Sequence, residues 1–133
     1  MKYHDFLGEV QHRAEMAETQ QAVTATRATL ETMAERVHRG EVSDVAAQLP
    51  RELAVYLENA QEKPERFSAQ EFVKRVAARE EADLPDAAYH ARVVLEVLGE
   101  ALTPNEFTQL RGQFPADYND LFEAGSKGEM DLE

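Results

Sequence analysis

Two Glu-x-x-His pairs carry the most specific chemistry in this 133-residue chain. Glu9 and His12 form one pair, and Glu35 and His38 form the other. Helical bundles that hold two iron ions use this motif twice, together with one further Glu from each of two other helices. The spacing places the Glu and the His on one face of a helix, so these four residues are a candidate metal site.

The helical phase of both pairs argues against that metal site. Successive residues turn by about 100° around a helix, so His12 lies nearly opposite the apolar stripe of Phe6 and Val10. Glu35 likewise lies nearly opposite the stripe that contains Leu30. Ligands of such a site must point into the bundle. We therefore favour solvated helix faces, and we keep a metal- or small-ligand-binding bundle as the alternative.

Asp86 and His90, one helical turn apart, are the second candidate for chemistry. An Asp that orients a His is a common arrangement for a general base. The sequence places no Ser or Cys nucleophile beside them, so a half-buried His with a local hydrogen bond is the simpler interpretation. The sequence predicts no catalytic residue and no cofactor, and we expect a protein that is not an enzyme.

Two segments, 27–57 and 92–122, repeat each other at an interval of 65 residues, and this repeat predicts the architecture. Apolar positions stay apolar in both copies, and seven further positions are identical. The identical pairs are Arg27/Arg92, Leu30/Leu95, Glu31/Glu96, Glu35/Glu100, Glu41/Glu106, Gln48/Gln113 and Pro50/Pro115. A short repeat cannot bury its apolar face alone. The sequence predicts an all-α, eight-helix bundle built from two tandem four-helix repeats related by approximate two-fold symmetry.

The same pattern sets the predicted domain organisation. Apolar residues recur at helical spacing from residue 3 to 57 and again from residue 67 to 122, whereas residues 58–66 are polar and contain Pro64. We expect a single domain, 1–133, with repeat one at 3–57, a linker at 58–66, repeat two at 67–122 and a flexible tail at 123–133. The repeated Arg and Glu residues are either ordinary surface pairs or ties between helices.

The second long helix differs from the first by an additional apolar flank. Val93, Val97 and Ala101 form this flank, whereas the first long helix has Ala28 and Thr32 at two of the equivalent positions. The flank is either buried between the repeats or exposed to a protein partner or to a second copy. If the protein has a contact surface, we predict that Val93, Val97 and Ala101 form it.

The net charge of −12 excludes some functions. With 26 acidic and 14 basic side chains, the chain is poorly suited to contact nucleic-acid phosphates or an anionic membrane surface. We expect neither partner. The N-terminus lacks the apolar segment of a signal peptide, no stretch is long enough to span a membrane, and there is no cysteine. These features favour a cytoplasmic protein.

Several short segments together resemble a known family. They are Tyr-x-x-Phe-Leu near the N-terminus, Arg-x-x-Leu-Glu in the first long helix, then Gln-Leu-Pro, Arg-Phe-Ser-x-x-Glu-Phe and Gln-Phe-Pro. The chain from about residue 3 to 122 is similar to DUF2267, a bacterial domain family of unknown function. The resemblance implies a small, helical, cytoplasmic bacterial protein, and it implies no activity. Our leading hypothesis is a non-enzymatic protein-interaction or structural module.

Overall fold

The computed structural model describes residues 1–126, and every regular element in that range is helical. This confirms the predicted all-α class. Residues 127–133, in the predicted flexible tail, lie outside the described range. The elements are α1 (Tyr3–Arg13), α2 (Thr19–Arg36), α3 (Arg39–Ala47), α4 (Arg51–Ala54), η1 (Val55–Leu57), α5 (Ala69–Glu80), α6 (Leu84–Ala101), α7 (Pro104–Arg111), η2 (Ala116–Tyr118) and α8 (Asn119–Glu123).

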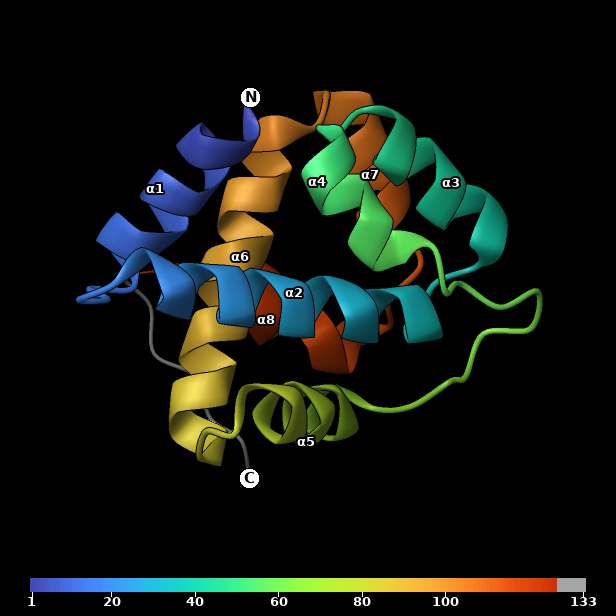
Figure 1. Ribbon diagram of the computed structural model, residues 1–133. Coiled ribbons are helices and arrows are strands. Elements are labelled where there is room, and N and C mark those ends of the chain that lie inside the picture. The colour runs from blue at the N-terminus through green and yellow to red at the C-terminus, as the bar shows by residue number, and fades with distance from the viewer. Residues whose placement is uncertain (127–133) are drawn as a thin grey trace.

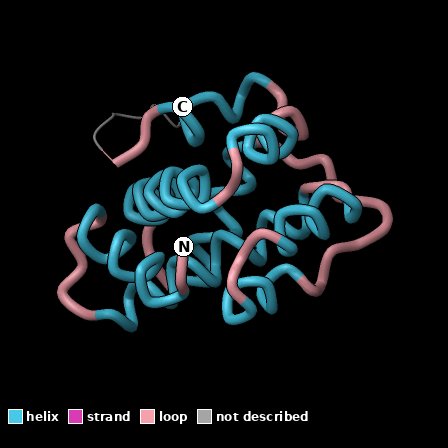
Figure 2. The backbone as a smooth tube through the Cα atoms, turned by 90° about the horizontal axis from the view of Figure 1, so that it is seen from above, coloured by secondary structure: helices cyan, strands magenta, loops and turns pink. Residues whose placement is uncertain are grey.

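The two long helices cross at the centre of the molecule. In Figure 1, α2 runs across the view and α6 passes behind it. Helices α1 and α5 each contact both long helices, while α3 contacts α7 at one end of the molecule. Figure 2 shows these helices joined by loops. Residues 58–66, the predicted linker, form no helix and extend away from the body at the right of Figure 1.

Local capping signals fix the helix starts in the second half. The side chain of Ser68 accepts a hydrogen bond from the Glu71 backbone N–H at 3.2 Å. Asp83 accepts from the Asp86 N–H at 2.9 Å, at the start of α6. Such a cap contributes about 1 kcal/mol by satisfying an N–H that has no partner within the helix. Sequence-local chemistry therefore determines where the elements begin.

The core occupies the space between the long helices and contains the flank that we predicted as a contact surface. Val93 and Val97 are 0% exposed and Ala101 is partly buried. The predicted interaction surface is therefore wrong at Val93 and Val97. Helix α6 is central, and it is contacted by α1, α2, α5 and α8, so its additional apolar side packs inside the chain.

The predicted tail begins too early. Arg92 donates from Nε and Nη2 to the Gly125 carbonyl oxygen at 3.0 and 2.7 Å. The backbone N–H of Ser126 donates to Glu96 at 2.7 Å. Residues 125 and 126 therefore contact α6, although the sequence-based prediction placed them in the tail. The rest of that prediction, 127–133, lies outside the described residues.

Candidate functional site

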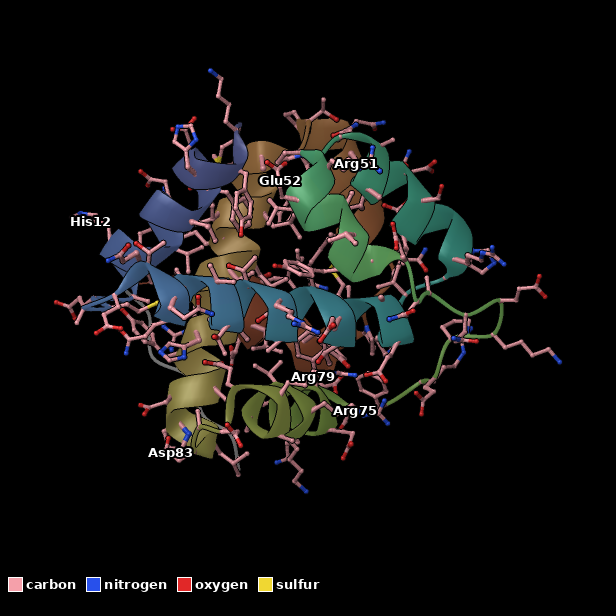
Figure 3. All side chains as sticks on the ribbon, viewed as in Figure 1. His12, Arg51, Glu52, Arg75, Arg79 and Asp83 are labelled. Atoms are coloured by element: carbon pink, nitrogen blue, oxygen red, sulfur yellow. The ribbon has the colours of Figure 1, made fainter. Side chains whose placement is uncertain are left out.

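The four residues of the predicted Glu-x-x-His site are not brought together. Glu9 accepts a hydrogen bond from Arg13 at 2.8 Å, and His12 lies exposed on α1, at the left of Figure 3. Glu35 accepts from Arg79 at 2.8 Å. His38 caps α3, where its Nδ1 accepts from the Gly40 backbone N–H at 3.0 Å. Glu9, Glu35 and His38 make other contacts and His12 is exposed, so the structure does not assemble the alternative metal site that we kept open for these residues.

His90 has a partner that the sequence did not suggest. Its Nδ1 lies 2.7 Å from Oε2 of Glu80, at the end of α5, whereas Asp86 is exposed and is not hydrogen-bonded to the ring. The hydrogen bond to Glu80 raises the pKa of His90 above its ordinary value, in opposition to burial, which lowers it. The pair closes the α5–α6 turn. The expected half-buried His with a local hydrogen bond is present, but Glu80 replaces Asp86.

The repeated glutamates are ties between helices. Arg13 of α1 donates to Glu96 at 2.7 Å and to Glu100 at 2.8 Å, both on α6. On the other side, Arg79 of α5 donates to Glu35 of α2 at 2.8 Å and lies 3.7 Å from Glu31. The first helix of each half therefore binds the long helix of the other half. Both interpretations of the repeated residues therefore apply: Glu35, Glu96 and Glu100 tie helices together, and Glu31 also makes an ordinary surface pair with Arg27 at 3.2 Å.

A separate group of carboxylates lies where α3 meets α7. Glu41 and Asp44 of α3 and Glu106 of α7 each place one oxygen within 4.8 Å of the others, and this is the one such group of potential metal ligands within residues 1–126. Glu106 is buried, with 8% of its surface exposed. Its Oε2 and the Oε2 of Glu41 are buried without a hydrogen-bond partner.

Gln48 explains why Glu106 faces this cluster. A Glu at the third position of a helix commonly folds back to accept the N-cap N–H. Here the N-cap residue Thr103 instead donates its N–H to Oε1 of Gln48 at 2.9 Å, and Thr103 Oγ1 accepts from the Glu106 N–H at 3.2 Å. The Glu106 carboxylate is therefore free of capping and lies toward Glu41. Gln48, at the end of α3, therefore caps the neighbouring helix α7.

The three carboxylates repel one another. Burial raises the pKa of Glu41 to about 8, together with a hydrogen bond to Glu106, which forms only when one of the two carboxyl groups is protonated, and the charges of Glu106 and Asp44. The two helix N-termini supply only about half a positive charge each, which does not balance three carboxylates. No salt bridge found among the described residues involves Glu41, Asp44 or Glu106. The group is suited to hold a proton or a cation with oxygen ligands.

A second acidic region lies at the turn between α5 and α6. We call residues 80–86 the acidic turn. Glu81, Asp83 and Asp86 are exposed there, and between them Leu84 is 43% exposed, an unusual value for a large apolar residue in this chain. Figure 3 shows Asp83 at the outer edge of the molecule. The acidic turn combines an accessible apolar side chain with excess negative charge.

The family model for DUF2267, described as an uncharacterized conserved protein, matches residues 3–121. The chain belongs to the DUF2267 family. No curated protein matches it. Among the residues that the structure describes, this DUF2267 protein has no helix with the length and apolarity needed to cross a membrane. The match confirms the resemblance drawn from the sequence, and it transfers no functional residue.

One signal for the carboxylate group was present in the sequence of this DUF2267 protein. Glu41 and Glu106 are equivalent positions of the repeat, and both lie in the first turn of a helix. When two copies of a unit pack together, positions near their junction meet their own counterparts. Identity of an acidic residue at such a position was therefore a clue. Asp44 gave no clue, because its counterpart is Gln109.

Proposed function

We propose that this protein is a non-enzymatic helical module that binds a basic, partly apolar segment of another protein at the acidic turn. The exposed Leu84 among acidic side chains carries the proposal. Because single exposed apolar residues are common, the surroundings of Leu84 matter more than its exposure. Glu81, Asp83 and Asp86 surround it in the sequence, and all three are exposed.

The surface beside Leu84 offers a place for an apolar side chain. Leu84 borders a hollow of about 160 Å³ whose other lining residues are Gln70, Val73 and Lys74. That volume suits one or two side chains of a peptide and is smaller than a typical small-molecule pocket of about 300–1,000 Å³. Lys74 adds one positive charge at the rim, which the carboxylates of the acidic turn outnumber.

The negative net charge of the chain favours a basic partner. Two copies that each carry a net charge of −12 repel each other, and nucleic acid is repelled in the same way. Several arginines, including Arg13, Arg75 and Arg79, already bind carboxylates within the chain, so they do little to attract an anionic partner. Attraction between opposite charges would make a basic protein segment associate faster and more specifically with this acidic chain.

The same proposal covers the remaining expectations. We infer a cytoplasmic, bacterial protein whose two halves are related by approximate two-fold symmetry. The reciprocal ties of Arg13 to α6 and of Arg79 to α2 support that symmetry. The pairing of His90 with Glu80 is compatible with a general base, so the non-enzymatic role rests instead on the fact that no Ser or Cys within residues 1–126 is hydrogen-bonded to His90.

A labelled amphipathic helical peptide of Lys and Leu tests the acidic turn by fluorescence anisotropy. We expect the peptide to bind the native chain and to bind Leu84→Ser about tenfold more weakly, since burying much of an exposed leucine is worth about 1.4 kcal/mol. Glu81→Gln is expected to weaken binding by a smaller factor and to reduce its dependence on salt.

Two controls isolate the site. A peptide with Glu in place of Lys should not bind. Val55→Ser alters another exposed apolar residue, on η1, and should leave the affinity unchanged. No binding of the Lys–Leu peptide at 0.1 M NaCl, or equal losses in Leu84→Ser and Val55→Ser, would reject the proposal. Both substitutions are at exposed positions, so the fold is expected to tolerate them.

A further inference from the structure

We propose that Glu41, Asp44 and Glu106 form a site for one hard divalent cation of about the size of Ca²⁺, held between α3 and α7. The site is distinct from the acidic turn, and it goes beyond the peptide-binding function proposed above. It joins the two halves of the chain, because α3 belongs to the first and α7 to the second.

The spacing of the carboxylate oxygens suits a cation of this size. One oxygen from each residue lies within 4.8 Å of the others. Calcium binds oxygen at about 2.3–2.6 Å, so two ligands on opposite sides of the ion are about 4.6–5.2 Å apart. For Mg²⁺, with bonds of about 2.0–2.1 Å, that limit falls to about 4.2 Å. Because 4.8 Å is the upper bound of these separations, they suit Ca²⁺ over their whole range, whereas they suit Mg²⁺ only where they fall below about 4.2 Å.

An unpartnered buried oxygen is the independent sign that the group holds a ligand. Glu106 is more than nine-tenths buried, and its Oε2 has no hydrogen-bond partner. The Oε2 of Glu41 is in the same condition. A buried polar atom left without a partner destabilises the fold by about 1–3 kcal/mol, and by more when it is charged. A cation between the helices would satisfy both oxygens at once.

The donor set points to the class of ion. All three side chains offer only carboxylate oxygen, which suits Ca²⁺, Mg²⁺ and Mn²⁺ better than zinc or copper. His38 lies near in sequence, but its Nδ1 already accepts the Gly40 N–H. Water would complete the coordination, because three side chains cannot supply the six to eight ligands of calcium. Such an incomplete protein shell resembles weak calcium sites, with a Kd of about 10⁻⁴–10⁻³ M.

The position of the site gives binding a structural consequence. Helices α3 and α7 contact each other, and the side chain of Gln48 links them by binding Thr103 at 2.9 Å. A cation on Glu41 and Glu106 would add a second link between these helices and remove the repulsion between their carboxylates. Because the unfolded chain lacks this arrangement, cation binding should stabilise the folded protein.

The test measures thermal unfolding of chelator-treated protein by circular dichroism. We expect 10 mM CaCl₂ to raise the Tm by about 4–6 °C above NaCl of equal ionic strength, with a smaller rise for MgCl₂. Isothermal titration should give one Ca²⁺ per chain. Glu106→Gln and Glu41→Gln each remove one ligand charge, and both should abolish the calcium-dependent rise.

The stability of these two variants without a cation shows whether the loss of the calcium effect is due to a damaged fold. Neither Glu41 nor Glu106 takes part in a salt bridge among the described residues. Without a cation, both variants should therefore have a Tm at least as high as that of the native chain. Asp120→Asn removes an exposed charge on α8 and should keep the full calcium effect. A rise that survives in Glu41→Gln and Glu106→Gln would assign the effect to general screening of the net charge. That result, a larger rise with MgCl₂, or no rise at all would overturn the proposed site.

Discussion

The two long helices carry the same Arg and Glu residues in the same register, yet the arginines have different roles. Arg27 of α2 is a surface residue whose side chain is 62% exposed and pairs with Glu31 at 3.2 Å. Its counterpart Arg92 of α6 is 6% exposed and binds the Gly125 carbonyl oxygen through two nitrogens. Residue identity at a repeat position therefore does not determine burial. The difference arises because the chain after α8 returns to α6.

The glutamates, in contrast, keep one role in both halves. Glu35 of α2 binds Arg79, and Glu100 of α6 binds Arg13. Arg13 and Arg79 also follow equivalent apolar residues, since Phe6 and Phe72 stand seven positions before them. Both halves therefore use an ion pair between their first helix and the long helix of the other half. Only the second half has a segment after its last helix, residues 125 and 126, that binds its long helix.

Replacing Arg27 and Arg92 in turn should give the largest difference in stability between equivalent positions of the two long helices. Arg92→Ala leaves the buried Gly125 carbonyl without its donors and removes the packing of a long side chain, so we expect a loss of about 3 kcal/mol in the free energy of unfolding. Arg27→Ala removes an exposed ion pair and should change it by less than about 0.5 kcal/mol. Urea denaturation followed by circular dichroism measures both.

Arg92→Lys makes the comparison sharper. It keeps the positive charge but cannot reproduce the two hydrogen bonds of the planar guanidinium group, so it should recover only part of the stability lost in Arg92→Ala. Equal losses for Arg27→Ala and Arg92→Ala would contradict the claim that the segment after α8 separates the two halves.

The reciprocal ties should have a smaller and more equal effect. In double-mutant cycles, we expect Arg13→Met with Glu100→Gln, and Arg79→Met with Glu35→Gln, to give coupling energies of about 0.5–1 kcal/mol each. The pairs are partly exposed, so 1 M NaCl should reduce both values. Denaturation in urea at low and high salt supplies the measurement.

The surface pair Arg39–Glu62 serves as the control cycle, because both of its side chains are largely exposed and the two atoms lie 3.6 Å apart. Its coupling should be near zero. If only one of the two ties showed coupling, the glutamates would not share a role, and the equivalence drawn between α2 and α6 would fail.

Elements were predictable where their cause is local. The spacing of apolar residues predicted the helical class, and the caps at Ser68 and Asp83, which set two helix starts, also lie within one turn of chain. The burial of Val93 and Val97 does not depend on neighbouring residues in the sequence. An apolar flank has the same pattern whether another helix of the chain or a separate protein covers it, so only the position of α6 at the centre decided the matter.

The candidate sites depended even more on distant contacts. Motif spacing singled out His12 and His38, yet the structure places one on an exposed face and uses the other as a cap. Glu41 and Glu106 are 65 residues apart in a chain with many glutamates, and no motif joins them. Their convergence follows from how α3 and α7 pack, which a single sequence does not encode in any local pattern.

The smallest effect concerns a position where the two long helices differ in residue type. His90 of α6 corresponds to Ala25 of α2, which is fully buried. The hydrogen bond to Glu80 raises the pKa of His90 above 6.5 in the folded protein. A raised pKa means that protonated His90 stabilises the fold fully below the unfolded pKa, and that this contribution is lost as the pH rises through the folded value.

His90→Gln should therefore lower the free energy of unfolding by about 1 kcal/mol at pH 6, where the native side chain is charged beside Glu80, and by clearly less at pH 9. Denaturation of both proteins at the two pH values measures the difference. His12→Gln, at an exposed position on α1, should show no such change between pH 6 and pH 9. A loss in His90→Gln that is the same at both pH values would mean that His90 contributes packing alone. In that case α6 would differ from α2 at this position in size and not in charge.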